Sequence, residues 1–393
     1  MSPTRILLLL CFSETLSMAG FSTVPALLPV LQSAWHLTAS EAGILGGSYF
    51  AGYILTVSWF SVLTDRVDAR KIFTLGACLS GAGSLGFAIL AQGFWSACLC
   101  QAVAGAGLAG TYMPGLRTLT DRVPTTHQSR FIAFYTSTFG IGTSLSYAAS
   151  GWIAAQWGWP AAFLNAGIQP LLAGILVWAG VGSRTPPPHP HRSMLRAQWQ
   201  AMQDSRVRFY VWGYAAHCWE LFGFRAWVVA MLTYAGTQGH LPVSAATLAA
   251  LINLVGIPAS IFGNEAATRG NRQRHIFRVM VISGGLAWLS GGVAAYPLVL
   301  ILVLPFYFWS VMADSAALTA GLVASAPSHS RGAALAVYSF AGFGGGLMAP
   351  ISAGWILGQC GGQESPWAWL LAWGSLGVWG LVHALLNRYS VQQ

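Results

Sequence analysis

The chain has 393 residues, of which only 7% are Asp, Glu, Lys or Arg, whereas soluble globular proteins carry about 25% charged residues. Apolar residues make up 55% of the chain, which excludes a disordered protein, and six cysteines without paired spacing exclude a disulfide scaffold and a zinc module. The composition predicts a protein that lies in a lipid bilayer.

The first apolar stretch resembles a secretory signal, because Arg5 precedes the apolar run Leu7 to Phe12. The apolar character continues past Glu14 to about Leu31, and no small-residue cleavage site interrupts it. We therefore expect an uncleaved first membrane helix.

The remaining chain divides into long apolar runs of about 20 residues, the length that crosses a bilayer as a helix. These runs lack the short alternating segments of a β-barrel. The predicted fold class is an all-α membrane protein with twelve transmembrane helices. Their expected ranges are approximately 6–31, 41–62, 72–92, 95–118, 131–155, 160–182, 208–235, 243–265, 275–294, 297–324, 333–358 and 366–386.

The basic residues predict the orientation. All 19 Lys and Arg residues except Arg117 and Arg225 fall on one side of the predicted helices. The opposite loops contain none, at 32–40, 156–159, 236–242 and 359–365. Basic loops stay in the cytoplasm, so we expect both termini to be cytoplasmic in a bacterial inner membrane. The net charge of +9 then reflects topology, and nucleic-acid binding is not expected.

A polar, proline-rich stretch separates two halves of the chain. It contains three consecutive prolines at 186–188, a composition that suits an extended linker. We predict a six-helix bundle over 1–182, a cytoplasmic central loop over 183–207 and a second six-helix bundle over 208–393.

The two halves repeat each other. Pro124, Tyr135 and the run Ser150 to Ile153 have counterparts 203 positions later in Pro327, Tyr338 and the run Ala353 to Ile356. Duplicated bundles of this kind are typical of secondary transporters.

The loop between the second and third predicted helices, Ser61 to Lys71, resembles the signature loop of the major facilitator superfamily, Gly-x-Leu-x-Asp-Arg-x-Gly-Arg-Arg/Lys. The matching residues are Leu63, Asp65, Arg66, Arg70 and Lys71, and the departures are Ser61, Asp68 and Ala69. The resemblance implies two pseudo-symmetric six-helix bundles that work by alternating access. It also implies a functional monomer that carries a small molecule, without a cofactor.

The resemblance also implies gating residues. The Asp of the family loop sits at the end of the eleventh helix and holds a cytoplasmic gate. We therefore expect Asp65 to cap the helix that starts near Gly332, with Arg66 and Arg70 completing a charge cluster. A carboxylate near a helix N-terminus gains about 0.3–1 kcal/mol.

Two other family motifs are degraded. Gln101 stands where the resemblance would place an Arg linked to proton coupling in some members, and the fifth helix lacks the proline of the antiporter motif. The closest similarity is to small anion and metabolite permeases, in the run Tyr112 to Arg117.

Five ionisable residues fall inside predicted helices, where a charge costs about 2.5–3.5 kcal/mol and usually marks a pathway. They are Glu14, His217, Glu220, Arg225 and Asp314. The resemblance places their helices, the first, seventh and tenth, around a central cavity.

The seventh helix carries the densest group. At about 100° per residue, His217, Glu220 and Arg225 share one arc of roughly 140°. We interpret Glu220 as a proton carrier, His217 as its substrate-binding neighbour and Arg225 as an anion-binding group, because a guanidinium can donate two parallel hydrogen bonds. A structural Glu220–Arg225 pair is the alternative.

Further residues complete the candidate site. Glu14 and Asp314 are alternative proton sites. Asn253, Tyr112, Tyr307 and Tyr338 are candidate hydrogen-bonding groups for the substrate, although a tyrosine in a membrane helix also serves packing or interface anchoring. The sequence shows no metal or cofactor constellation.

The leading hypothesis is a proton-coupled transporter of a small organic or inorganic anion. The alternative is a proton-driven exporter of cationic or amphipathic compounds, since the predicted helices hold three acids against one Arg. A transporter-like sensor and a membrane enzyme are weaker alternatives, because the termini are short and no nucleophile–base pair is evident.

Overall fold

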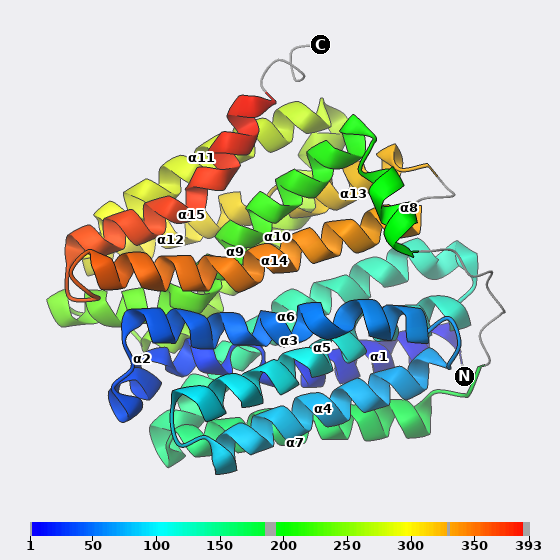
Figure 1. Cartoon of the computed structure of the whole chain (residues 1–393), viewed down its shortest axis with the longest axis horizontal. Coiled ribbons are helices and arrows are strands. Elements are labelled where there is room, and N and C mark those ends of the chain that lie inside the picture. The colour runs from blue at the N-terminus through cyan, green and yellow to red at the C-terminus, as the bar shows by residue number, and fades with distance from the viewer. Residues whose placement is uncertain (1, 185–193, 328–330, 388–393) are drawn as a thin grey trace. The chain divides into compact units, whose positions relative to one another are not determined.

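The computed structural model describes residues 2–184, 194–327 and 331–387, and every regular element in these ranges is a helix (Figure 1). The first half contains α1 (Pro3–Ser17), η1 (Met18–Gly20), α2 (Thr23–Trp35), α3 (Ala39–Leu63), α4 (Ala69–Leu90), α5 (Phe94–Arg122), α6 (Thr125–Trp157) and α7 (Trp159–Gly180). The second half contains α8 (Met194–Ala201), α9 (Ser205–Gln238), α10 (Ala245–Arg269), α11 (Arg272–Gly292), α12 (Pro297–Met312), α13 (Ser315–Ser325), α14 (Arg331–Gln359) and α15 (Pro366–Leu386).

The predicted fold class is confirmed, since each of the predicted ranges lies on one helix or on consecutive helices. By length and hydropathy, 7 stretches of the described residues are long and apolar enough to cross a membrane. The count of twelve membrane spans stays a prediction. Within the predicted central loop, the short helix α8 was not anticipated, and the proline run lies outside the described residues.

The first predicted span is interrupted, which the sequence did not indicate. The chain breaks at η1, between α1 and α2. Ser146 of α6 stabilises the break, because its hydroxyl donates to the carbonyl of Ala19 at 2.6 Å and accepts the N–H of Ser22 at 3.0 Å. A helix can break at membrane depth only where such partners replace the lost backbone hydrogen bonds.

The predicted span 297–324 is interrupted as well, at Ala313 and Asp314, between α12 and α13. The carbonyl of Ala313 contacts the Nε2 atom of His275, from α11, at 3.1 Å. Gly263 of α10 packs so closely here that an added Cβ would overlap this carbonyl. The break therefore lies against α10 and α11, and the Asp314 carboxyl beside it contacts His217 of α9.

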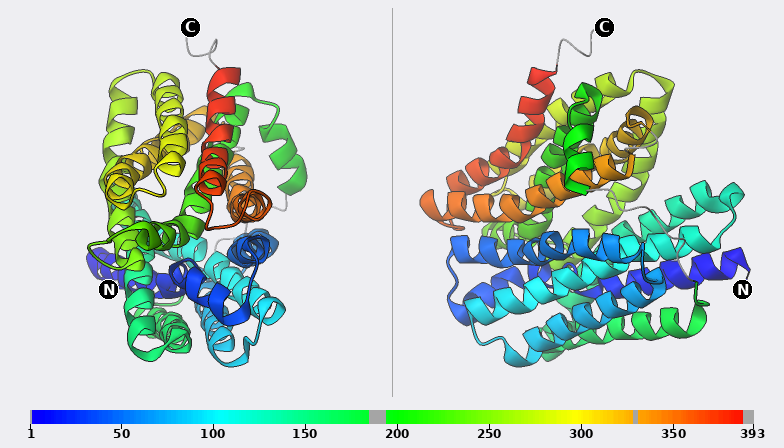
Figure 2. Two further views of the ribbon diagram at one scale, coloured as in Figure 1. Left: turned by 90° about the vertical axis from the view of Figure 1, so that its left-hand side faces the viewer. Right: turned by 45° about the vertical axis from the view of Figure 1, so that its right-hand side comes forward.

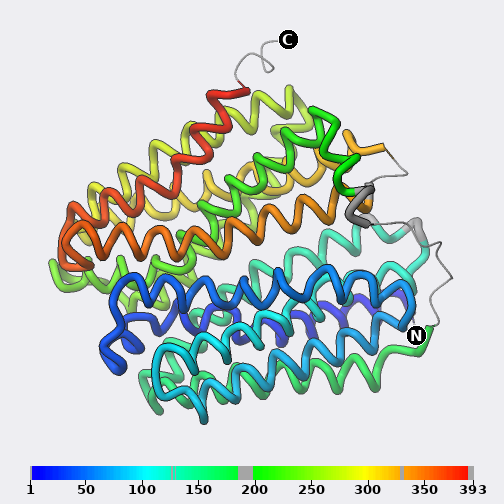
Figure 3. The backbone as a smooth tube through the Cα atoms, in the orientation of Figure 1, coloured from blue at the N-terminus to red at the C-terminus, as the bar shows by residue number. Residues whose placement is uncertain are grey.

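The chain forms two compact units, residues 1–37 with 48–190, and residues 38–47 with 191–393. Within the first unit, α4 packs along α5 and α7 (Figure 2). Within the second unit, α9 packs on α14 and α15, and α11 lies along α15 (Figure 3).

Glycines bring these helix pairs close together. A Cβ on Gly107 of α5 would overlap the backbone nitrogen of Ser80 in α4, and a Cβ on Gly377 of α15 would lie 2.6 Å from the Cα of Gly284 in α11. Small residues allow such close approach, which supplies packing energy where lipid provides no hydrophobic drive. These contacts could not be located from the sequence, because they depend on how the helices pair.

Candidate functional site

The three candidate site residues of α9 turn toward different neighbours. His217 contacts Asp314 beside α13, Glu220 contacts α11, and Arg225 contacts α10. All three side chains are buried. The structure thus divides the single arc that helical periodicity predicted into separate contacts, and the partners argue for different chemistry at each position.

His217 and Asp314 form a buried pair. The Nδ1 atom of His217 lies 2.7 Å from Oδ1 of Asp314, and their side chains are only 1% and 4% exposed. Tyr214 stacks parallel to the His217 ring at 5.8 Å between centroids. The pair thus brings an imidazole nitrogen and a carboxylate oxygen together in a buried position.

Arg225 is held by a neutral amide and by aromatic rings. Its Nε atom donates to Oδ1 of Asn253 at 3.0 Å, and the Asn253 amide nitrogen donates in turn to the carbonyl of Ala249 at 2.9 Å. The rings of Phe222 and Phe308 lie 5.9 and 5.8 Å from the guanidinium carbon. Asn253 therefore orients the guanidinium without neutralising its charge.

Glu220 faces α11 and α15. Oε2 of Glu220 accepts a hydrogen bond from the Ser283 hydroxyl of α11 at 3.1 Å, and Gly380 of α15 packs near the same oxygen. The Tyr307 hydroxyl lies within electrostatic reach of the carboxyl, and the Tyr307 ring packs edge-on against Phe224. Sequence reasoning missed Ser283, because a serine in an apolar run carries no distinguishing signal.

Glu14 is fully buried in the first unit. The Tyr135 hydroxyl, from α6, donates to Oε2 of Glu14 at 3.1 Å and to the backbone carbonyl of Tyr112 at 3.0 Å. The rings of Tyr112 and Tyr135 are stacked. Tyr112 thus supplies a carbonyl to this cluster, and Tyr135, noticed in the sequence only as a repeat marker, is the partner of the acid.

Tyr338, the repeat counterpart of Tyr135, meets a hydroxyl. Its OH lies 2.9 Å from Oγ1 of Thr319, and its ring stacks on Tyr214 with centroids 3.8 Å apart. Tyr338 therefore packs against the same aromatic side chain that covers His217.

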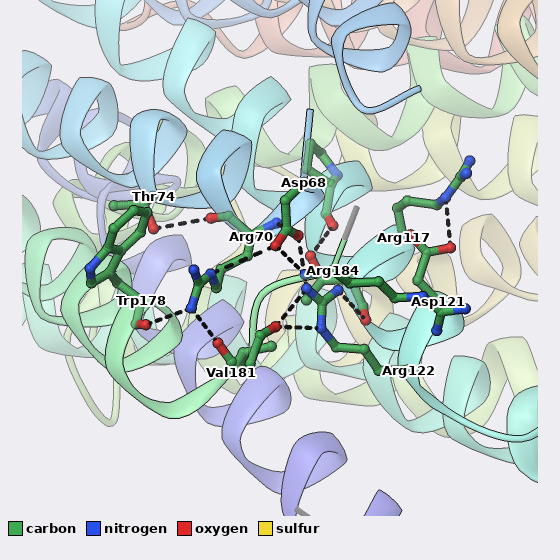
Figure 4. A network of polar contacts seen from close by, with 12 residues as sticks. Asp68, Arg70, Thr74, Arg117, Asp121, Arg122, Trp178, Val181 and Arg184 are labelled. Carbon is green, nitrogen blue, oxygen red and sulfur yellow. Dashed lines mark hydrogen bonds and ion pairs between the residues drawn. The ribbon is translucent and has the colours of Figure 1, made fainter. Parts of the chain in front are cut away.

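A polar network at the predicted cytoplasmic end of the first unit centres on Asp68 (Figure 4). Asp68 caps α4 by accepting the N–H of Arg70, pairs with Nη2 of Arg122 at 2.8 Å, and accepts the N–H of Arg184 at 2.7 Å. Arg122 also donates to the carbonyl of Gly182. The network ties the start of the central loop to α4 and α5.

The pKa of Asp68 reflects this environment. Burial raises the pKa of the carboxyl, but the hydrogen bonds from Arg184, Arg122 and Arg70 outweigh burial and bring the pKa below its usual range. Sequence reasoning treated Asp68 only as a departure from the family loop. Its signal was an acidic residue directly before a helix that begins with basic residues.

The predicted gating residues lie around this network. Asp65 is 3.5 Å from Nη1 of Arg117, which also pairs with Asp121 at 2.9 Å. Arg70 donates to the carbonyls of Trp178 and Val181 at the end of α7. The expected cap by Asp65 on the helix near Gly332 stays a prediction, as does the role of Arg66.

Comparisons with known proteins support the fold. The chain is 26% identical over 171 residues to an uncharacterized MFS-type transporter of Salmonella enteritidis, covering 42% of this chain and 44% of the relative. It is 25% identical over 162 residues to a probable 4-methylmuconolactone transporter of Cupriavidus pinatubonensis, covering 38% and 36%. The chain thus spans less than half the length of these curated relatives.

Solved structures match over nearly the whole chain. A bacterial homologue of the human lysosomal transporter Spinster has a TM-score of 0.81 at 15% identity, with 99% of this chain and 97% of that one covered. A D-xylose–proton symporter has a TM-score of 0.76 at 16% identity, with 98% and 96% covered. The sequence profile of the superfamily matches residues 10–350. The chain therefore belongs to the Major Facilitator Superfamily and is an integral membrane protein.

Proposed function

We propose that the protein is a secondary active transporter of a bacterial inner membrane that moves a small organic or inorganic anion together with protons by alternating access. The observation that carries this proposal is the buried guanidinium of Arg225, oriented by the amide of Asn253. A buried cation in a membrane helix is costly and is retained where it serves a solute or a pathway.

The chemistry of Arg225 favours an anion. A guanidinium presents five N–H donors in a rigid fork that matches the two oxygens of a carboxylate or a phosphate, and the amide of Asn253 fixes this fork through Nε. The rings of Phe222 and Phe308 exclude water from the charge, which strengthens its attraction for an anion.

The proton would bind on the same helix. His217 lies two turns before Arg225 on α9 and forms a buried contact with Asp314. One helix therefore connects the proposed proton site with the proposed anion site. Glu220 and Glu14 are further buried carboxyls that can take up protons. A proton bound near an anion offsets its charge, which lowers the cost of moving the anion through lipid.

Two relatives are named for the transport of anions. Two Arabidopsis thaliana relatives are named for ascorbate and for sodium-dependent phosphate transport, at 25% and 26% identity. Both solutes are anions at neutral pH. Each match covers 41% of this chain, so the solute remains a proposal.

The test is transport into proteoliposomes under an imposed pH gradient. A thermal-shift screen with phosphate, ascorbate and 4-methylmuconolactone would first select the solute. Asn253→Asp is the most informative variant, because a carboxylate beside Arg225 would compete with the anion. We expect transport and the anion-induced shift to fall about tenfold or more.

Asn264→Asp is the matched control, since it makes the same change on α10 away from Arg225. Arg225→Ala should abolish transport, and Glu220→Gln should alter its pH dependence. Full transport in both Asn253→Asp and Arg225→Ala would refute the anion site.

Export of cationic or amphipathic compounds is the second candidate function. It is favoured by Oε1 of Glu14 and Oε1 of Glu220, each of which is buried without a hydrogen-bond donor among the described residues. A buried carboxylate oxygen of this kind attracts a proton or a cation. The same thermal-shift screen, extended to hydrophobic amines, would favour this function if amines alone stabilise the protein in a manner that depends on Glu14 or Asp314.

A further inference from the structure

The Tyr135 hydroxyl faces two acceptors with one hydrogen. Its oxygen lies 3.1 Å from Oε2 of Glu14 on α1 and 3.0 Å from the carbonyl oxygen of Tyr112 on α5. A phenol has a single O–H, so it can donate fully to only one of these oxygens at a time. Whether the phenol donates to Glu14 or to the Tyr112 carbonyl depends on whether the Glu14 carboxyl is ionised and needs a donor.

The Tyr135 hydroxyl fits beside α5 because residue 115 is a glycine and has no side chain. A Cβ on Gly115 would overlap the Tyr135 hydroxyl, so only glycine leaves room for it beside α5. The Tyr135 ring is fully buried and stacks on Tyr112. Because the ring is fixed, the O–H can rotate but the oxygen stays between its two acceptors.

We propose that Tyr135 is a positioning residue whose O–H changes its acceptor when Glu14 takes up a proton. The O–H then rotates away from the Glu14 carboxyl and donates to the Tyr112 carbonyl. With Glu14 ionised, the phenol donates to the carboxylate. With Glu14 protonated, the acid O–H donates to the phenol oxygen, and the phenol donates to the carbonyl. No covalent bond of the tyrosine breaks, and the proton comes from solvent. The inference rests on the part of the proposed function that makes Glu14 a proton site.

Protonation of Glu14 therefore changes which helix is hydrogen-bonded to α6. Tyr135 ties α6 to α1 when the acid is charged, and it ties α6 to α5 when the acid is neutral. Protonation on α1 is thereby converted into a stronger α5–α6 contact. In the second unit, the counterpart Tyr338 meets Thr319, a hydroxyl that carries no charge to lose. The device therefore belongs to the first unit.

The surroundings of Glu14 allow this assignment. The titratable groups that face its carboxyl from the packed helices are Cys11 of α1, Tyr49 of α3, Tyr112 of α5 and Tyr135 of α6. Thiols and phenols are uncharged at neutral pH in their ordinary forms. Within the described residues around this cluster, Glu14 is thus the group whose charge changes.

The experiment is infrared spectroscopy of the full-length protein in lipid during a pH titration. The carbonyl stretch of protonated Glu14 is identified by its loss in Glu14→Gln. In Tyr135→Phe, which removes the donor that favours the carboxylate, we expect this band to change frequency and to emerge at a pH about one unit higher. Gly115→Ala, which keeps the hydroxyl but blocks its seat, should also displace the band.

Tyr147→Phe is the matched control, a buried tyrosine on the same helix. It should leave the band in place. A Glu14 band that is unchanged in both Tyr135→Phe and Gly115→Ala would overturn the inference and leave the proposed transport intact. If wild-type protein shows no Glu14 band at any pH, Glu14 is no proton site, and both the inference and that part of the proposed function fail.

Discussion

At the scale of single residues, burial decides what each charge can do. Arg225 and Asn253 were both recognisable in the sequence, because polar residues in apolar runs are conspicuous. Their pairing was not, since it depends on how α10 is rotated against α9. A Glu220–Arg225 pair was the alternative interpretation, and the structure instead gives Glu220 a hydrogen bond from Ser283 on α11. Residue identity was predictable, and residue partnership was not.

Asp68 gives a prediction at this scale. Asp68→Asn keeps a side-chain oxygen that can cap α4 but removes the charge that faces Arg122. We expect it to lower the free energy of unfolding by about 1.5–3 kcal/mol, the contribution of a hydrogen bond to a charged group. Asp68→Ala also removes the cap and should lose about 1 kcal/mol more. Thermal unfolding followed by tryptophan fluorescence measures both.

The pH dependence of the same variants provides the control. The pKa of Asp68 is lower in the folded protein than its usual value near 3.9. Its stabilisation is therefore fully present above about pH 4 and is lost as the pH falls through the lower folded value. The stability difference between wild type and Asp68→Asn should shrink on acidification below pH 4. A difference that stays constant would contradict an electrostatic role.

At the scale of helices, the residue ranges of the helices are predictable, because each helix that crosses the lipid bilayer needs an apolar stretch of about 20 residues. The breaks between α1 and α2 and between α12 and α13 were missed. Their backbone groups are satisfied from other helices, by Ser146 and by His275. Such partners lie more than a hundred residues away in the first case, so no local pattern announces them. Asp314 owes its position to a break of this kind.

Close helix packing gives the second prediction. Gly107→Ala would push α5 away from the backbone of α4 at Ser80. We expect a loss of about 1–3 kcal/mol, the usual cost of overpacking. Gly285→Ala on α11 is the matched control, because nothing lies within 4 Å of an added Cβ there. It should be neutral or stabilising by about 0.5–1 kcal/mol. Equal melting temperatures for the two variants would refute the packing argument.

At the scale of the whole molecule, composition and the family loop were sufficient to predict the fold and the superfamily. The match to residues 10–350 and the solved structures confirm both. The solute could not be predicted in the same way, because one fold carries many solutes and specificity lies in a few side chains. Asp68 illustrates the same limit at the predicted cytoplasmic end. Its partner Arg184 follows 116 residues later, after α4, α5, α6 and α7, so only the folded chain brings the two residues together.

The orientation in the membrane gives the last prediction. All Lys and Arg residues except Arg117 and Arg225 fall on one predicted side, and the positive-inside rule assigns that side to the cytoplasm. A fluorescent protein fused to the C-terminus should therefore fold and fluoresce, since it stays in the cytoplasm. Alkaline phosphatase, which is active only outside, should be active when fused after residue 240 or 362 and inactive after residue 270. The opposite pattern at residues 240 and 270 would show that the basic loops face outward, and it would move Asp65 and Asp68 to the outer surface.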